Sequence, residues 1–150
     1  MEQLQAALDI SLAQASEFTR SLFGEDHWDA SQVSEFVNSI RNMTAATVSA
    51  KGEPHAAVVI AVCLDGDIHF TAAPKSALSR NLRNSDQIAF TFSDAAHSIM
   101  GRGKAIVAAN ALDDLELVGR LAALTKGGVF VPAGWDGLIY RIETERVFAN

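Results

Sequence analysis

The residues that could carry chemistry in this sequence are few, and its four histidines are the first candidates. His27, His55, His69 and His97 are widely separated along the chain, and Cys63 is the only cysteine. Metal sites in proteins are usually built from His, Cys or carboxylate ligands at short, regular spacing. We therefore expect no metal site in this chain.

The motifs of several large enzyme classes are absent as well. The chain contains neither a Gly-x-x-x-x-Gly-Lys phosphate loop nor a Gly-x-Ser-x-Gly nucleophile elbow. Gly101-Arg102-Gly103 could open a dinucleotide-binding motif, but it lies within a strand pattern, lacks the third glycine at the right offset and is not followed by a helix. These absences argue against a P-loop nucleotide hydrolase, an α/β-hydrolase and a dinucleotide-binding enzyme.

The composition is that of one folded domain whose charge disfavours anionic partners. Hydrophobic residues make up 49% of the chain, charged residues 20%, and the formal net charge is −6. A negative protein repels phosphate backbones and anionic lipids, so we expect neither nucleic acid nor a membrane as a partner. Cys63 lies in an apolar run and is expected to be buried, and a single cysteine with no signal-peptide pattern favours a cytoplasmic location.

The N-terminal part of the chain has the periodicity of helices. Apolar residues including Leu4, Leu8 and Leu12 fall near one face of a helix predicted over residues 2–22, and a second helix is predicted over residues 31–40. Both patterns are amphipathic. We expect residues 2–41 to cover the rest of the domain.

The remainder is dominated by strand patterns separated by turn signals, of which Asp65-Gly66 is the sharpest. Helices are predicted over residues 75–84 and from Asp113 to Leu124. Strands are predicted over residues 44–50, 55–64, 68–72, 87–93, 98–108, 137–142 and 146–149. Six or seven antiparallel strands, with a helix between the third and the fourth, predict a small closed barrel over residues 43–149. The whole chain, residues 1–150, is predicted to be a single domain.

Several segments, taken in order, resemble one family of proteins. They are Thr47-Val48-Ser49 with Gly52-x-Pro54-His55, then Asp65-Gly66-Asp67-Ile68-His69-Phe70-Thr71, then Ser76-x-x-x-Arg80-Asn81-Leu82-Arg83-Asn84, then Gly103-Lys104-Ala105, and finally Trp135-x-Gly137-Leu138-Ile139-Tyr140-Arg141-Ile142-Glu143-x-Glu145-Arg146-Val147. Together they resemble the pyridoxamine 5'-phosphate oxidase-like flavoproteins over residues 30 to 149. The resemblance implies a fold that is mainly β with helices, a split antiparallel β-barrel with N-terminal helices.

The resemblance also implies a homodimer that holds FMN, or a deazaflavin in some branches, in a groove between two barrels. A flavin phosphate needs cations or N–H donors, which a helix N-terminus supplies. Lys75, Ser76 and Arg80 stand at the start of the predicted helix 75–84 and are the candidates. The alternative is a solvated charged turn in which Ser76 only caps the helix.

A flavin ring needs flat apolar walls and strand backbone groups that hydrogen-bond its polar edge. Val58, Val59 and Thr71 match the wall positions, although core packing would explain β-branched residues equally. Trp135 matches a tryptophan near the flavin of the partner subunit, or it fills the barrel. His97 could bind the polar edge of the cofactor or coordinate haem, whereas a surface-loop histidine is the simpler interpretation.

The chain departs from the family where cations are expected. Leu78 stands where relatives place Lys or His, and Ala57 and Val62 replace basic residues of the oxidase branch. True pyridoxamine-phosphate oxidase activity is therefore not expected. Two classes of function stay open: a flavin-dependent oxidoreductase of unknown small-molecule substrate, and a non-catalytic binding or sensor protein for a flavin, haem or another planar ligand.

Overall fold

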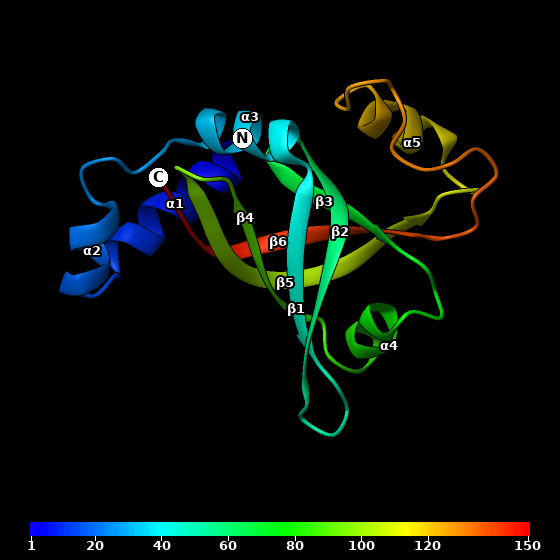
Figure 1. The fold of residues 1–150 in the computed structure, drawn as a ribbon, viewed down its shortest axis with the longest axis horizontal. Coiled ribbons are helices and arrows are strands. Elements are labelled where there is room, and N and C mark those ends of the chain that lie inside the picture. The colour runs from blue at the N-terminus through cyan, green and yellow to red at the C-terminus, as the bar shows by residue number, and fades with distance from the viewer.

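The computed structural model describes all of residues 1–150 as a closed barrel with helices around it (Figure 1). The strands follow one another around the barrel in the order β1-β2-β3-β6-β5-β4, and every neighbouring pair is antiparallel. The helices are α1 (Glu2–Ala13), α2 (Glu17–Phe23), α3 (Ala30–Ile40), α4 (Ala77–Asn84) and α5 (Leu115–Ala122). The strands are β1 (Asn42–Val48), β2 (Pro54–Leu64), β3 (Asp67–Ala72), β4 (Gln87–Ser93), β5 (Ser98–Asn110) and β6 (Leu138–Ala149). The mainly β split-barrel prediction is thereby confirmed.

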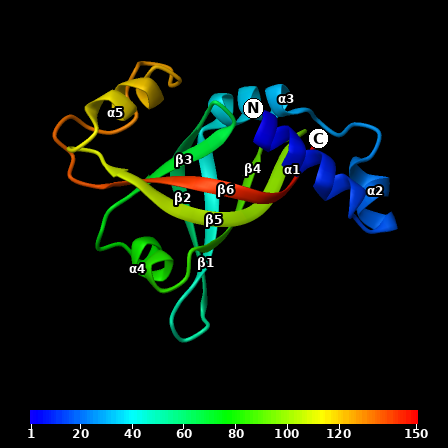
Figure 2. The same ribbon diagram turned by 180° about the vertical axis from the view of Figure 1, so that it is seen from behind.

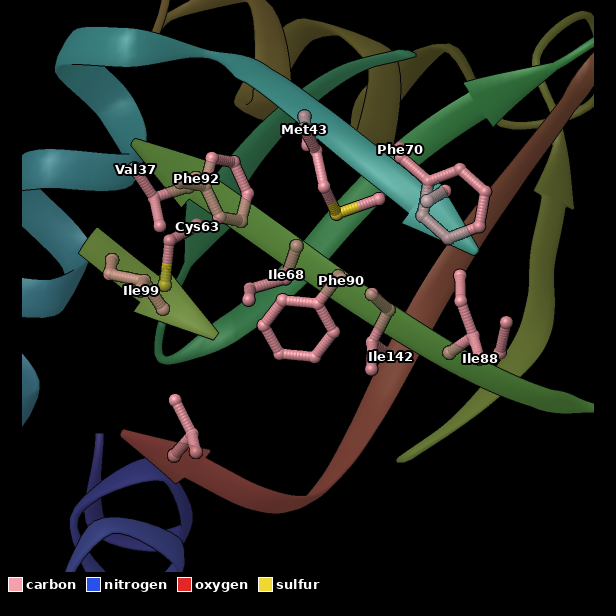
Figure 3. Close-up of a cluster of buried hydrophobic side chains, with 14 of the residues drawn as sticks. Val37, Met43, Cys63, Ile68, Phe70, Ile88, Phe90, Phe92, Ile99 and Ile142 are labelled. Atoms are coloured by element: carbon pink, nitrogen blue, oxygen red, sulfur yellow. The ribbon is translucent and has the colours of Figure 1, made fainter. Parts of the chain in front are cut away.

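The barrel interior is filled by alternate residues of its strands. In β4, for example, Ile88, Phe90 and Phe92 are buried while the residues between them are exposed, as a period of two requires. Figure 3 shows these side chains converging with Met43, Ile68 and other apolar groups into one cluster. Cys63 belongs to the same cluster, so the expected burial of its thiol is confirmed, and this burial raises the pKa of Cys63.

The N-terminal helices lie against one end of the barrel (Figures 1 and 2). Leu4 and Leu8 of α1 are buried in the barrel cluster, and the hydroxyl of Ser11 accepts a hydrogen bond from the backbone N–H of Val147. The single helix predicted over residues 2–22 is wrong, because the chain turns after α1. Ser16 then caps a separate helix α2, its hydroxyl accepting from the N–H of Thr19.

The C-terminal part also differs from the prediction in one respect. The two strands expected over residues 137–142 and 146–149 form one continuous strand, β6, which pairs with β3 and β5. A bulge between Thr144 and Arg146 lets β6 bend around the barrel without ending. Helix α5 covers a second, smaller apolar cluster outside the barrel, formed by Val62, Ala111, Leu121, Phe130 and Ile139. No helix of the structure combines the length and the apolar character that crossing a membrane requires.

Candidate functional site

The barrel is split along one edge of β2. Strand β3 pairs with β2 only over residues 61–64, so the N-terminal half of β2 is paired to β1 alone. From Pro54 to Ile60 the other edge of β2 therefore has no strand partner. The backbone N–H and C=O groups of such an edge are free to bind another molecule.

Helix α4 lies beside this edge, at the end of the barrel opposite the N-terminal helices (Figure 1). Its apolar face is buried: Leu78 is 2% exposed and belongs to the barrel cluster. Two buried hydrogen bonds fix its orientation. The amide of Asn81 donates to the hydroxyl of Thr47 at 3.1 Å, and the hydroxyl of Tyr140 donates to that of Ser79 at 3.1 Å. The start of α4 is thus held rigidly next to the open edge.

Between β2 and α4 runs a groove with two lobes, which we call the barrel-edge groove. The inner lobe has a volume of about 350 Å³ and the outer lobe about 620 Å³, and both lobes are lined by His55 and Ala77. The inner lobe is further lined by Ala57, Val59, Thr71, Ala72, Ala73, Ser76 and Leu78. The outer lobe is further lined by Ser49, Ala50, Lys51, Glu53, Pro54, Arg80, Asn81 and Asn84.

The structure brings four of the predicted site residues to this groove. Val59, Thr71 and Ser76 line the apolar inner lobe, and Arg80 lines the polar outer lobe. Lys75 is exposed at the start of α4 and its carbonyl accepts a hydrogen bond from Arg80 at 2.8 Å. The groove is therefore apolar at one end and cationic at the other.

Ser76 has the capping role that the sequence offered as the alternative. Its hydroxyl accepts from the N–H of Ser79 at 3.1 Å and donates to the carbonyl of Ala73 at 2.7 Å. Its own donor is therefore already used within the protein. Arg80 by contrast donates one guanidinium N–H to the carbonyl of Lys75, which leaves most of its five donors free. The guanidinium of Arg80, the side chain of Lys51 and the first N–H groups of α4 are therefore the groups of the groove that are available to an anion.

His55 is a site residue that the sequence analysis did not single out. It lines both lobes, and its Nδ1 atom is buried without any hydrogen-bond partner. An unpaired buried nitrogen is costly, and a ligand in the groove would relieve that cost. The signal was present in the sequence, because His55 shares its side of β2 with Val59 at even spacing.

Val58, one of the three expected ring-wall residues, does not lie at the groove. Val58 is 70% exposed on the outer face of β2, since it alternates with Val59, and it does not line the groove. At position 78, where the resemblance implies a cation, the apolar side chain of Leu78 forms part of the inner lobe and of the core.

His97 lies away from the groove. It is in the turn between β4 and β5, whereas α4 precedes the opposite end of β4. A strand of this length separates its two ends by roughly 20 Å. The His97 ring is exposed and lies 5.2 Å from that of Trp28 and 5.9 Å from that of Phe36. The surface position weighed in the sequence analysis is the one observed.

Trp135 does not fill the barrel and does not line the groove of its own chain. It lies in the loop before β6 and packs on the outer cluster beneath α5. Its ring occupies the space beside Gly137 that a Cβ would fill, which explains why residue 137 is glycine. No group of three or more His, Cys, Asp and Glu side chains is arranged to hold a metal ion.

Comparison with known protein families gives one match, which covers most of the chain. The model of the family described as pyridoxamine 5'-phosphate oxidase matches residues 30–147. No curated protein matches the chain.

Solved structures share the fold at low sequence identity. Rv2991, a conserved hypothetical protein from Mycobacterium tuberculosis, is 21% identical with a TM-score of 0.67, over 81% of this chain and 84% of that one. An FAD binding protein from Mycobacterium smegmatis is 14% identical with a TM-score of 0.62, over 83% and 95% of the two chains. A heme binding protein from Mycobacterium smegmatis is 17% identical with a TM-score of 0.60, over 82% and 54%. At these identities the likeness establishes the split-barrel fold.

Proposed function

Because this chain belongs to the pyridoxamine 5'-phosphate oxidase family, we propose that it is a flavin-binding protein which holds FMN in the barrel-edge groove. The observation that carries the proposal is the coincidence of three features at one place. These are the unpaired edge of β2, the apolar inner lobe beside it and the free guanidinium of Arg80 at the outer lobe. A flavin mononucleotide has a flat apolar ring with a polar edge and a phosphate, and each part has a counterpart here.

The residues of the groove fit such a ligand in a specific way. The backbone groups of β2 would hydrogen-bond the polar edge of the ring, and Val59 and Thr71 would contact its face. The unpaired Nδ1 of His55 lies where the two lobes meet, so it would bind the chain that links ring and phosphate. Arg80 and the N–H groups at the start of α4 would bind the phosphate.

A second part of the proposal is that two copies of the chain form a homodimer. The outer face of β2 carries Val58 and Ile60, which are 70% and 43% exposed, and the neighbouring face of β1 carries Val48 at 50%. Apolar side chains gathered on adjacent strands favour burial against a partner. In such a dimer the Trp135 of one copy would approach the groove of the other, as the family resemblance implies. A solution mass of about 16 kDa by light scattering, that of one chain, would contradict this part.

We further propose a redox role, with the substrate a small molecule. Bound FMN supplies hydride and single-electron chemistry, so the protein needs only to position the ring and exclude water, and no catalytic side chain is required. Oxidation of pyridoxamine phosphate is not part of the proposal, because Ala57, Val62 and Leu78 replace the cations of that branch.

The experiment is to add FMN, haem and FAD separately to the purified protein, remove the unbound ligand and record visible spectra. The proposal predicts a retained flavin spectrum with FMN, and a weaker one for the variant Arg80→Ala. Arg20→Ala removes an exposed arginine of α2 and serves as the matched control. Retention of haem with a Soret band and no retention of FMN would contradict the proposal and favour a haem-binding protein.

A further inference from the structure

A second groove lies on the outer surface of the barrel, over strands β4, β5 and β6. It has a volume of about 390 Å³ and is lined by Ala89, Met100, Gly101, Arg102, Arg146 and Phe148. In the order of strands around the barrel, β5 stands across from β2, so this groove and the barrel-edge groove are formed by different parts of the wall. We call it the arginine groove.

The strand register explains how its side chains come together. Arg102 of β5 is directly opposite Arg146 of β6, and Met100 is directly opposite Phe148 two residues along. Side chains at i and i+2 share one face of a strand, so the four form a square on the outer surface. The Cβ atoms of directly opposed residues are about 5 Å apart, so one small ligand can contact both guanidinium groups. On the β4 side Arg102 faces Ala89, whose small side chain leaves the groove open.

The backbone is adapted to this arrangement. The bulge in β6 comes directly before Arg146, and bulges commonly redirect the side chains next to them. A Cβ at Gly101 would lie 2.5 Å from the ring of Phe90 and 2.7 Å from the carbonyl oxygen of Arg146. Glycine therefore allows the strands to bend closely around the core at the floor of the groove.

The two arginines lack the partners that such a pair would be expected to have. Arg102 takes part in no side-chain hydrogen bond and no ion pair, and Arg146 donates only to the side-chain oxygen of Gln14. Like charges that face each other directly across two strands destabilise a sheet. Because the chain has more acidic than basic residues, an acidic partner for each arginine would be expected. An anion bound between the two would remove the repulsion and use the free donors.

From this geometry we propose that the arginine groove binds a small organic anion with a flat apolar body. Its charged oxygens lie between Arg102 and Arg146, since a guanidinium pairs with planar oxyanions through two parallel hydrogen bonds. Its body rests on Met100 and Phe148, because thioether and aromatic groups favour flat partners. A carboxylate and a phosphate ester share this chemistry. The site is separate from the proposed FMN site and does not depend on it.

The test is a titration of the folded protein with benzoate, followed by nuclear magnetic resonance at constant ionic strength. Saturable shifts of the Met100 methyl group and the Gly101 amide are expected. Acetate lacks the apolar body and benzyl alcohol lacks the charge, so both should bind at least roughly tenfold more weakly. A parallel titration with phenyl phosphate shows whether the groove prefers a carboxylate or a phosphate ester. If benzoate and phenyl phosphate both bind more weakly than acetate, the proposal is overturned.

Variants separate this site from general charge effects. Arg102→Gln should weaken benzoate roughly tenfold, the value of one charge-assisted contact, while Lys126→Gln, an exposed lysine of the loop after α5, should leave it unchanged. Arg102→Gln should not lower the melting temperature, because the side chain of Arg102 makes no hydrogen bond or ion pair that would be lost. The same variant should leave FMN binding intact, and Arg80→Ala should leave benzoate binding intact. Equal weakening by Arg102→Gln and Lys126→Gln, or shifts that do not saturate, would overturn the proposal.

Discussion

Replacing Leu78 by lysine places a cation at a position where the family resemblance implies one, and the burial of Leu78 determines what this replacement costs. The side chain is 2% exposed and packs in the barrel core, but it also lines the inner lobe of the barrel-edge groove. Truncating such a leucine costs about 2–5 kcal/mol. A lysine retains the methylene stem and can extend its ammonium into the groove, so we expect a smaller cost of about 1–3 kcal/mol. For a chain of this size the melting temperature should fall by roughly 2–10 °C.

For an added contact to form, the ammonium at position 78 has to reach from the inner lobe, which Leu78 lines, towards the proposed phosphate position beside Arg80 in the outer lobe. One added charge-assisted contact should strengthen FMN binding by about 1.5 kcal/mol, roughly tenfold. The assay is quenching of FMN fluorescence for wild type, Leu78→Lys and Leu78→Met, with thermal melts of all three. Leu78→Met conserves volume without charge and should leave the affinity unchanged. A lowered melting temperature with no gain in FMN affinity for Leu78→Lys would refute the placement of the phosphate at this end of α4.

Four further changes test other parts of the structure. Burial lowers the pKa of His69 below its ordinary 6.5, so the unfolded state binds the proton more readily. The stability from the neutral ring is complete above pH 6.5 and should fall as the pH drops below it. His69→Gln should reduce this loss between melts at about pH 7.5 and 5.5, leaving the contribution of His27, whose pKa burial also lowers. Gly137→Ala places a methyl group in the space of the Trp135 ring and should shift tryptophan emission to longer wavelength with a lower melting temperature; an unchanged spectrum would show that Trp135 is not packed as described. Leu8→Ala, at a fully buried position of α1, should lower the free energy of unfolding measured in urea by about 2–5 kcal/mol. Deleting residues 1–22 should expose the apolar surface beneath α1 and cause aggregation. A truncated protein that stays soluble and equally stable would show that α1 is an appendage.

The sequence predicted the fold well where side-chain alternation and turn chemistry act locally. Strand β4 shows strict alternation, and Asp65-Gly66 forms its predicted turn with positive φ at both residues. The errors fell where a local signal competes with tertiary contacts. The break after α1 depends on the cap at Ser16, which an amphipathic pattern running through both helices concealed. The bulge in β6 resembles a gap between strands in the sequence, because only pairing with β5 shows the strand to be continuous.

The candidate site was predicted in part, for a similar reason. Arg80 and Ser76 were predicted because helix starts have recognisable chemistry, and Val59 and Thr71 were predicted from the family resemblance; the structure places all four at the groove. His55 was missed although its spacing with Val59 could be read in the sequence, because the burial of its Nδ1 without a hydrogen-bond partner is evident only in the folded chain. The distance of His97 from α4 was already implied by the predicted strand over residues 87–93, which separates the helix from His97 by its own length.

The central claim is that the barrel-edge groove binds a flavin through its phosphate as well as its ring. Riboflavin and FMN differ only in that phosphate, so their dissociation constants, measured by fluorescence titration on wild type and Arg80→Ala, test the claim directly. We predict that wild type binds FMN at least roughly tenfold more tightly than riboflavin, and that Arg80→Ala largely removes this difference while riboflavin binding stays the same. Equal binding of FMN and riboflavin by wild type, or a preference for FMN that survives in Arg80→Ala, would contradict it.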